Sequence, residues 1–203
     1  WRSIRQSRKE KFNLAITLNK KFSATATFFT LCAGATINAG YRHSQSSWGY
    51  NIQLPVEGPP CHEIENNLAL LKHMGVPQII QQPQIYFNDG EKQKIAGFIN
   101  SNKKARPLIL VKTGTRIPEW GWQWEKFQIV IEHILKNDIA DIWMINGPGE
   151  EAELESHIAR MEFKPRLLPL VKVKELALLM QQCDLLFCNH TGIMHLASAV
   201  EKP

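Results

Sequence analysis

The sequence predicts an α/β fold built on parallel sheets, and three features indicate it. From Pro107 onward, short apolar runs of strand length alternate with segments of helical periodicity, joined by short polar turns. A strand, a helix and a second strand are also indicated, in that order, between residues 12 and 41. Hydrophobic residues make up 44% of the 203-residue chain, which is enough for packed cores.

The first half of the chain contains the elements of one α/β domain, which we place at residues 1–77. Gly34 and Gly75 each follow a segment of helical periodicity and are expected to end a helix. The stretch 44–60 is rich in Ser, Gly and Pro, which is typical of a loop. The other expected elements are strands at 12–18 and 36–41 and helices at 22–33 and 62–75.

Residues 78–106 are expected to link this domain to a second one, and they include a short amphipathic helix at 91–99. Residues 107–203 form the second domain. Its strands should be parallel with right-handed crossovers, so that ligands bind at their carboxyl ends. The expected strands are 108–112, 139–145, 166–170 and 184–188, and the expected helices are 124–136, 150–161, 173–182 and 193–200.

The net charge of +5 is concentrated at one end of the chain. Residues 1–21 hold seven Lys or Arg and one Glu, whereas the rest carries 17 basic and 18 acidic residues. Such a cationic segment can meet an acidic membrane surface or a phosphorylated glycolipid, or it can be a solvated surface. Nucleic acid is not expected as a partner, because no basic patch with interleaved aromatic residues recurs downstream.

The four cysteines, Cys32, Cys61, Cys183 and Cys188, form no C-x-x-C pair and have no histidine at ligand spacing, so no metal site is expected. Cys183 and Cys188 flank one predicted strand and would point to opposite faces of it, so no disulfide is expected between them. Reduced thiols are typical of a cytoplasmic protein. No apolar run approaches the roughly 18 residues of a membrane span, and no cofactor is indicated.

A candidate binding turn follows the last predicted strand. Asn189 to Gly192 breaks the apolar run, and helical periodicity resumes at Ile193, which places Thr191 and Gly192 at a helix N-terminus. Free backbone N–H groups and the helix dipole favour an anion there, so a phosphorylated ligand is expected. Alternatively, Thr191 is only an N-cap, Gly192 only a turn residue and His195 a packed helix histidine.

Two other predicted strands end in polar groups. The turn after 108–112 could hold phosphate through backbone N–H groups, hydroxyls and a cation; its residues are Thr113, Gly114, Thr115 and Arg116. Glu150 follows the strand 139–145 and could accept the two hydroxyls of a ribose. The alternative is that Glu150 and Glu151 only favour the first turn of a helix.

The segment Asn189–Pro203 resembles the C-terminal signature of glycosyltransferase family nine, the ADP-heptose:lipopolysaccharide heptosyltransferases, written N-D-S/T-G-P-M-H-L-A-A-A-x-x-K-P. His190 stands where this signature has Asp, and Ile193 where it has Pro. The matching residues are Asn189, Thr191, Gly192, Met194, His195, Leu196, Ala197, Ala199, Lys202 and Pro203.

Shorter upstream stretches are similar to other segments of the same family. Residues 34–40 resemble G-A-x-x-R-x-G without its arginine, 62–75 resemble H-x-V-E-x-N-L-x-L-L-x-x-L-G, and 146–150 resemble G-G-P-x-E. The family segment K-x-W-P-x-E-x-F is matched by Trp122, Glu125 and Phe127. Trp120 takes the position of its lysine.

The resemblance implies a GT-B-like architecture of two Rossmann-like domains, both incomplete in this chain. It makes 1–77 part of the acceptor-side domain, 78–106 the linker and 107–203 the donor-binding domain, within a longer protein. It further implies transfer of a heptose or related sugar from ADP-heptose to the lipopolysaccharide core, with inversion and without a metal. The family's catalytic base is an aspartate expected outside this chain, so no residue here is assigned as the base.

The resemblance also implies a donor site, in which Glu150 binds the ribose and Arg116 or Lys112 replaces the missing lysine. The expected donor-binding residues are Thr113, Gly114, Thr115, Arg116, Glu150, His190, Thr191, Gly192 and His195. The implied partners are an ADP-sugar and a lipopolysaccharide core or lipid A acceptor. A cytoplasmic location follows, with peripheral contact to the inner membrane surface as a further expectation.

A different class of function is a degenerate family member that binds a nucleotide-sugar or glycan without turning it over. His190 in place of Asp and Trp120 in place of Lys motivate this alternative. A P-loop or dinucleotide oxidoreductase domain is not favoured, because neither G-x-x-x-x-G-K-S/T nor G-x-G-x-x-G occurs.

Overall fold

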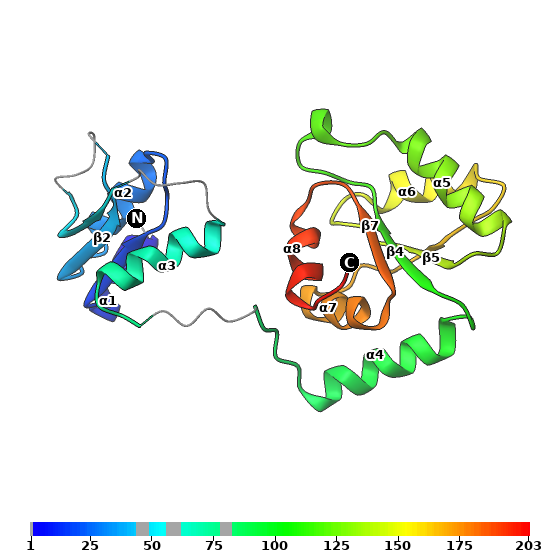
Figure 1. The fold of residues 1–203 in the computed structure, drawn as a ribbon, viewed down its shortest axis with the longest axis horizontal. Helices are drawn as coiled ribbons and strands as arrows, with labels where there is room; N and C mark the ends of the chain where they lie inside the picture. Colours follow the sequence, from blue (N-terminus) through cyan, green and yellow to red (C-terminus); the bar gives the residue numbers. More distant parts are fainter. Residues whose placement is uncertain (1, 44–48, 56–61, 78–82) are drawn as a thin grey trace. The chain divides into compact units, whose positions relative to one another are not determined.

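The computed structural model describes residues 2–43, 49–55, 62–77 and 83–203. The chain divides into two units, Trp1–Ile80 and Gln81–Pro203, and each contains one parallel sheet (Figure 1). The predicted α/β class is therefore confirmed. None of the described helices is long and apolar enough to cross a membrane.

The first unit has a three-stranded sheet in the order β1-β2-β3, with both strand pairs parallel. Ala39 and Tyr41 of the central strand are buried together with Leu54, which forms the core of this sheet. Its strands are β1 (Leu14–Thr17), β2 (Ile37–Tyr41) and β3 (Ile52–Leu54), and its helices are α1 (Arg2–Glu10), α2 (Ala24–Cys32) and α3 (Glu63–His73).

Two elements of this unit were not predicted. The helix α1 buries only Ile4 among basic and polar residues, so its sequence has no repeating apolar stripe to reveal it. The strand β3 lies within the predicted loop 44–60 and is only three residues long. The prediction of a loop is therefore wrong at β3, while residues 44–48 and 56–60 lie outside the described residues.

The second unit has a four-stranded parallel sheet in the order β6-β5-β4-β7. Five helices and a short 3₁₀ helix accompany it (Figure 1). The strands are β4 (Leu108–Lys112), β5 (Asp141–Met144), β6 (Arg166–Leu167) and β7 (Leu185–Cys188). The helices are α4 (Asp89–Asn102), η2 (Pro118–Trp120), α5 (Trp124–Lys136), α6 (Glu151–Ala159), α7 (Val173–Gln182) and α8 (Gly192–Ala199).

The two faces of this sheet are covered by different helices, because side chains alternate along its strands. In β4, Leu108 and Leu110 join a buried cluster with α4, α7 and α8. Ile109 and Val111 join a second cluster with α5 and α6. Because β4, β5 and β7 run parallel, the turns that follow them lie at the same carboxyl edge of the sheet.

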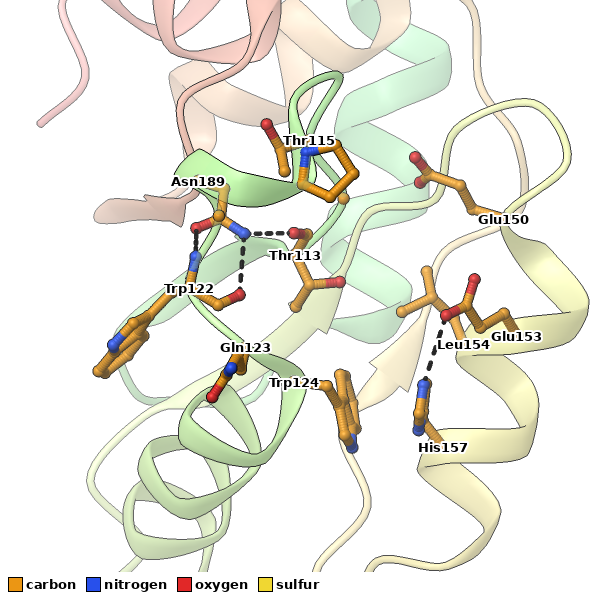
Figure 2. Close-up of a pocket in the computed structure, with 13 residues that line it drawn as sticks. Thr113, Thr115, Trp122, Gln123, Trp124, Glu150, Glu153, Leu154, His157 and Asn189 are labelled. Atoms are coloured by element: carbon orange, nitrogen blue, oxygen red, sulfur yellow. Dashed lines mark hydrogen bonds and ion pairs between the residues drawn. The ribbon is translucent and has the colours of Figure 1, made fainter.

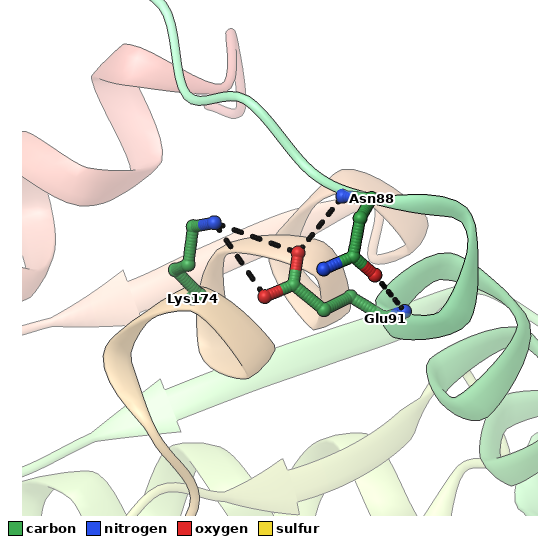
Figure 3. Close-up of polar contacts among 3 residues, drawn as sticks. All are labelled: Asn88, Glu91 and Lys174. Atoms are coloured by element: carbon green, nitrogen blue, oxygen red, sulfur yellow. Dashed lines mark hydrogen bonds and ion pairs between the residues drawn. The ribbon is translucent and has the colours of Figure 1, made fainter.

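Helix α4 is longer than the predicted helix 91–99 and packs into the second unit. Asn88 and Glu91 form a reciprocal capping box at its start, and Glu91 also meets Lys174 of α7 (Figure 3). Ile95 and Ile99 are each 5% exposed and lie in the core. This part of the predicted linker therefore belongs to the second unit.

The strand β6 is shorter than predicted, covering two residues of the expected 166–170. Pro169 carries no backbone N–H and cannot extend the ladder with β5. Leu168 still donates its N–H to the Met144 carbonyl at 2.9 Å, after which the chain leaves the sheet.

Candidate functional site

A cavity of about 360 Å³ opens at the carboxyl edge of the second sheet (Figure 2). The turn after β4, the start of α5, the start of α6 and the residue after β7 form its walls. Of the predicted donor-binding residues, those that line it are Thr113, Gly114, Thr115 and Glu150. The cavity is therefore lined from all three strand ends that the sequence singles out, although Asn189 is the only described residue of the turn after β7 that lines it.

The Glu150 carboxylate is held by two donors from the ends of β4 and β5. Its Oε2 forms an ion pair with Lys112 Nζ and accepts the Gly147 N–H at 2.8 Å. Lys112 is only 5% exposed, so this pairing offsets much of the cost of burying its ammonium. Among the described residues, Oε1 has no hydrogen-bond donor and remains free to accept from a ligand.

Gly114 lies against the ion pair between Lys112 and Glu150, where there is no room for a side chain. A Cβ at this position would collide with Glu150 Oε1 and lie 2.6 Å from Lys112 Nζ. Gly114, which the sequence predicts as part of a phosphate-binding turn, is thus also required by the packing of Lys112 and Glu150.

Asn189 holds two walls of the cavity together and was not predicted as a site residue. Its Nδ2 donates to the Thr113 carbonyl at 2.6 Å and to the Trp122 carbonyl at 3.2 Å, while Oδ1 accepts the Trp122 N–H at 2.7 Å (Figure 2). Asn189 is 7% exposed. Its position directly after an apolar strand, within the family signature, was the available signal.

Aromatic residues form the opposite wall of the cavity. The rings of Trp124 and His157 stack at 4.4 Å with an interplanar angle of 20°, and His157 Nε2 lies 3.7 Å from Glu153 Oε1 (Figure 2). The Trp122 ring packs edge to face on Phe127 and Phe187. Trp124 and His157 carried no motif, and only the fold brings them to this cavity.

The turn before α8 lies beside the cavity rather than in its wall. Thr191 occupies the N-cap position, but its hydroxyl makes no capping hydrogen bond. A Cβ on Gly192 would meet nothing within 4 Å, so space is open above this helix start. Thr115 Oγ1 donates to the His190 carbonyl at 3.1 Å and thereby connects this turn to the turn after β4.

The remaining predicted residues are solvent-facing. Arg116, His190 and His195 are exposed and do not line the cavity. The exposure of His195 excludes the alternative that it is a packed helix histidine. Whether these residues bind a donor remains a prediction.

The thiols of the second unit are free, as the sequence predicts. Cys183 and Cys188 form no disulfide, and burial raises the pKa of each thiol. Both are therefore protonated near neutral pH and serve as small apolar residues. Within the described part of the chain, no group of three or more His, Cys, Asp or Glu side chains could hold a metal ion.

A family model for glycosyltransferase family 9 (heptosyltransferase) matches residues 1–203. The chain belongs to this family. The resemblance found in the sequence is therefore confirmed over the whole chain. Among curated proteins, none matches the sequence.

Solved structures of family 9 share the fold. A glycosyl transferase family 9 structure from Veillonella parvula DSM 2008 has 20% identity and a TM-score of 0.78, covering 98% of this chain and 59% of its own. E. coli ADP-heptose lps heptosyltransferase II has 19% identity and a TM-score of 0.75, with coverages of 100% and 64%. E. coli heptosyltransferase WaaC with ADP has 17% identity and a TM-score of 0.70, with coverages of 98% and 61%.

These likenesses show the fold and support the GT-B-like architecture that the sequence predicts. The chain spans about three-fifths of the length of these structures. Two of the positions at which this chain departs from the family 9 motifs are close in space, because the rings of Trp120 and His190 meet edge to face.

Proposed function

We propose that this family 9 chain contributes the donor site of a glycosyltransferase that transfers a heptose or a related sugar from ADP-heptose to the lipopolysaccharide core. One observation carries the proposal. A glycine-containing turn, an acid with a free oxygen and an open helix N-terminus lie at neighbouring strand ends of one sheet. These groups fit the phosphates and the ribose of a nucleotide.

The donor would be bound by groups on both sides of the Thr115–His190 hydrogen bond. Glu150 Oε1 accepts from the ribose hydroxyls, while the backbone at Thr113–Thr115 and the α8 N-terminus at Thr191–Gly192 bind the diphosphate. Arg116, exposed on the same turn, supplies the cation that the family lysine would provide. His190 and His195 complete the predicted set, and two of the similar solved structures contain ADP or an ADP-sugar analogue.

In the transfer reaction, the bond between the sugar and the diphosphate breaks as an acceptor hydroxyl attacks. The N–H groups and cations stabilise the negative charge that develops on the departing ADP. In this assignment, the configuration at the sugar carbon is inverted because the hydroxyl attacks from the side opposite the departing ADP. No metal is required. The general base is not assigned to a residue of this chain.

The acceptor and the membrane surface are proposed partners of the first unit. Basic side chains of α1 line a hollow of about 730 Å³ on its surface, namely Arg2, Arg5, Arg8 and Lys9, around Ile4. Arg8 Nε also donates to the Cys32 carbonyl at 2.9 Å, so part of this charge anchors α1 to α2. The exposed cations suit a phosphorylated lipid A acceptor at the cytoplasmic face of the inner membrane.

A second candidate function is donor binding without transfer. It is favoured by the contact between Trp120 and His190, with ring centroids 6.2 Å apart, because both replace charged residues of the family motifs. A binding protein would keep the nucleotide contacts and lose the sugar contacts.

The test combines binding and transfer. Calorimetric titration of the full-length protein with ADP, GDP and UDP should give selective binding of ADP, and incubation of that protein with ADP-heptose and a lipid A acceptor should release ADP. Equal, weak binding of all three nucleotides would contradict both candidates. Selective ADP binding without ADP release would favour the second.

A further inference from the structure

Lys112 is the last residue of β4 and lies next to the proposed donor site, but it does not line the cavity. The role of its buried amine is therefore not explained by direct contact with a ligand there. Its side chain is 6% exposed, and its charge is directed at Glu150 rather than at solvent. Among the described residues, the cavity wall on this side is made by the Thr113–Thr115 turn. A ligand in the cavity would therefore meet Glu150 before it met Lys112.

The geometry at Glu150 separates its two carboxylate oxygens. Lys112 Nζ and the Gly147 N–H both bind Oε2, so the end of β4 and the end of β5 fix the carboxylate from one side. Oε1 lies beside Gly114, which has no side chain of its own to cover it. Figure 2 shows the Glu150 carboxylate at the cavity. One oxygen is thus used for orientation, and the other is left for a ligand.

We propose that Lys112 is a positioning residue for ribose recognition and does not itself bind the diphosphate. Its ammonium holds Glu150 in the one orientation that presents Oε1 to the ribose hydroxyls. It also neutralises a carboxylate that would otherwise repel a nucleotide diphosphate nearby. The inference rests on the proposed function, because it takes Glu150 as the ribose ligand.

The alternative role, direct contact with phosphate, makes a different prediction. A phosphate-binding lysine contributes equally to ADP and to 2′,3′-dideoxy-ADP, since both carry the same diphosphate. A lysine that positions Glu150 contributes to the preference for ADP, because only ADP has the ribose hydroxyls. The ratio of the two affinities is therefore the informative measurement. Repulsion from an unpaired Glu150 lowers the affinity for both ligands by the same factor and leaves the ratio of the two affinities unchanged.

The experiment is a calorimetric titration of the wild type and of Lys112→Met with ADP and with 2′,3′-dideoxy-ADP. The wild type should prefer ADP by about tenfold or more, as expected for charge-assisted hydrogen bonds. In Lys112→Met this preference should fall to about twofold or less. Lys126→Met, at an exposed lysine of α5, is the matched control and should keep the full preference.

A second variant protects the test against misfolding of Lys112→Met. Gly114→Ala keeps both charges but places a Cβ against Glu150 Oε1 and Lys112 Nζ, so it should also reduce the preference for ADP. An unchanged preference in folded Lys112→Met, with both affinities reduced equally, would overturn the positioning role. If Lys112→Met does not fold, an unchanged preference in Gly114→Ala would do the same. Absence of any ADP binding by the wild type would instead overturn the proposed function.

Discussion

The indole ring of Trp120 meets the imidazole of His190 edge to face, with 6.2 Å between the ring centroids. Trp120 lies at the end of η2, and His190 directly follows Asn189, whose side chain donates to the Thr113 carbonyl in the turn after β4. These residues take the positions of a lysine and an aspartate in the family motifs. Because their rings contact each other, we expect changes at these two positions to have non-additive effects.

The contact between Trp120 and His190 predicts what happens when each is replaced by the residue of the family motif. His190→Asp alone should weaken ADP binding, because it adds a negative charge beside the proposed diphosphate site. Trp120→Lys with His190→Asp should raise the affinity for ADP-heptose over ADP by about tenfold, since it supplies both a cation and a sugar-hydroxyl acceptor. Calorimetry on the wild type, both single variants and the double variant checks this. Strictly additive effects would contradict the expected non-additivity.

Much of the second unit could be predicted from the sequence, because its buried strands and amphipathic helices alternate without long interruptions. The strand order could not, since the pairing of β4 with β7 joins residues far apart in the chain. The role of α4 was missed for a related reason. Ile95 and Ile99 look like a weak apolar stripe until α7 and the sheet supply the surface that buries them.

In the candidate site too, the positions of residues after a strand could be predicted, whereas contacts between residues far apart in the chain could not. Thr113, Gly114 and Glu150 follow predicted strands, so their place at the sheet edge could be predicted. The pairing of Lys112 with Glu150 spans 38 residues, and the bond from Asn189 to Thr113 spans 76. Neither depends on a local pattern, so neither could be read from the sequence.

Gly192→Ala tests whether a phosphate approaches the α8 N-terminus. The added Cβ meets no protein atom within 4 Å, so the free energy of unfolding should stay the same or rise slightly. ADP affinity should fall about tenfold, because the Cβ would separate the phosphate from the backbone N–H groups. Gly97→Ala in α4, also without a contact within 4 Å, is the matched control for binding. Equal ADP affinities in both variants would remove Gly192 from the site.

Asn189→Ala should lower the free energy of unfolding by about 1–3 kcal/mol, because it leaves the Trp122 N–H and the Thr113 carbonyl without partners in a buried position. Asn189→Asp should cost at least as much, since a carboxylate would face two carbonyl oxygens. Urea unfolding followed by circular dichroism measures both. Asn137→Ala, at the exposed end of α5, should cost less than about 0.5 kcal/mol. Similar losses of unfolding free energy for Asn137→Ala and Asn189→Ala would show that Asn189 does not hold the two walls of the cavity together.

Asp184 joins the amino end of β7 to the amino end of β4. Asp184 Oδ2 accepts the Leu108 N–H at 2.7 Å and lies 3.5 Å from Lys103 Nζ. The Leu108 N–H is the main reason that the pKa of Asp184 lies below its usual range; burial opposes this shift, and Lys103 adds to it.

The sign of the pH effect follows from this lowered pKa. A carboxylate with a lower pKa in the folded state stabilises the fold fully above its unfolded pKa of about 3.9, and the contribution is lost as pH falls through the folded value. Asp184→Asn should therefore cost about 0.5–1 kcal/mol at pH 7, a modest value because the side chain is 55% exposed. The difference between wild type and variant should shrink below about pH 4. Urea unfolding between pH 7 and pH 2.5 measures it, with Glu155→Gln on the exposed side of α6 as the control. A difference that stays constant over this range would show that the Asp184 charge does not stabilise the strand pair.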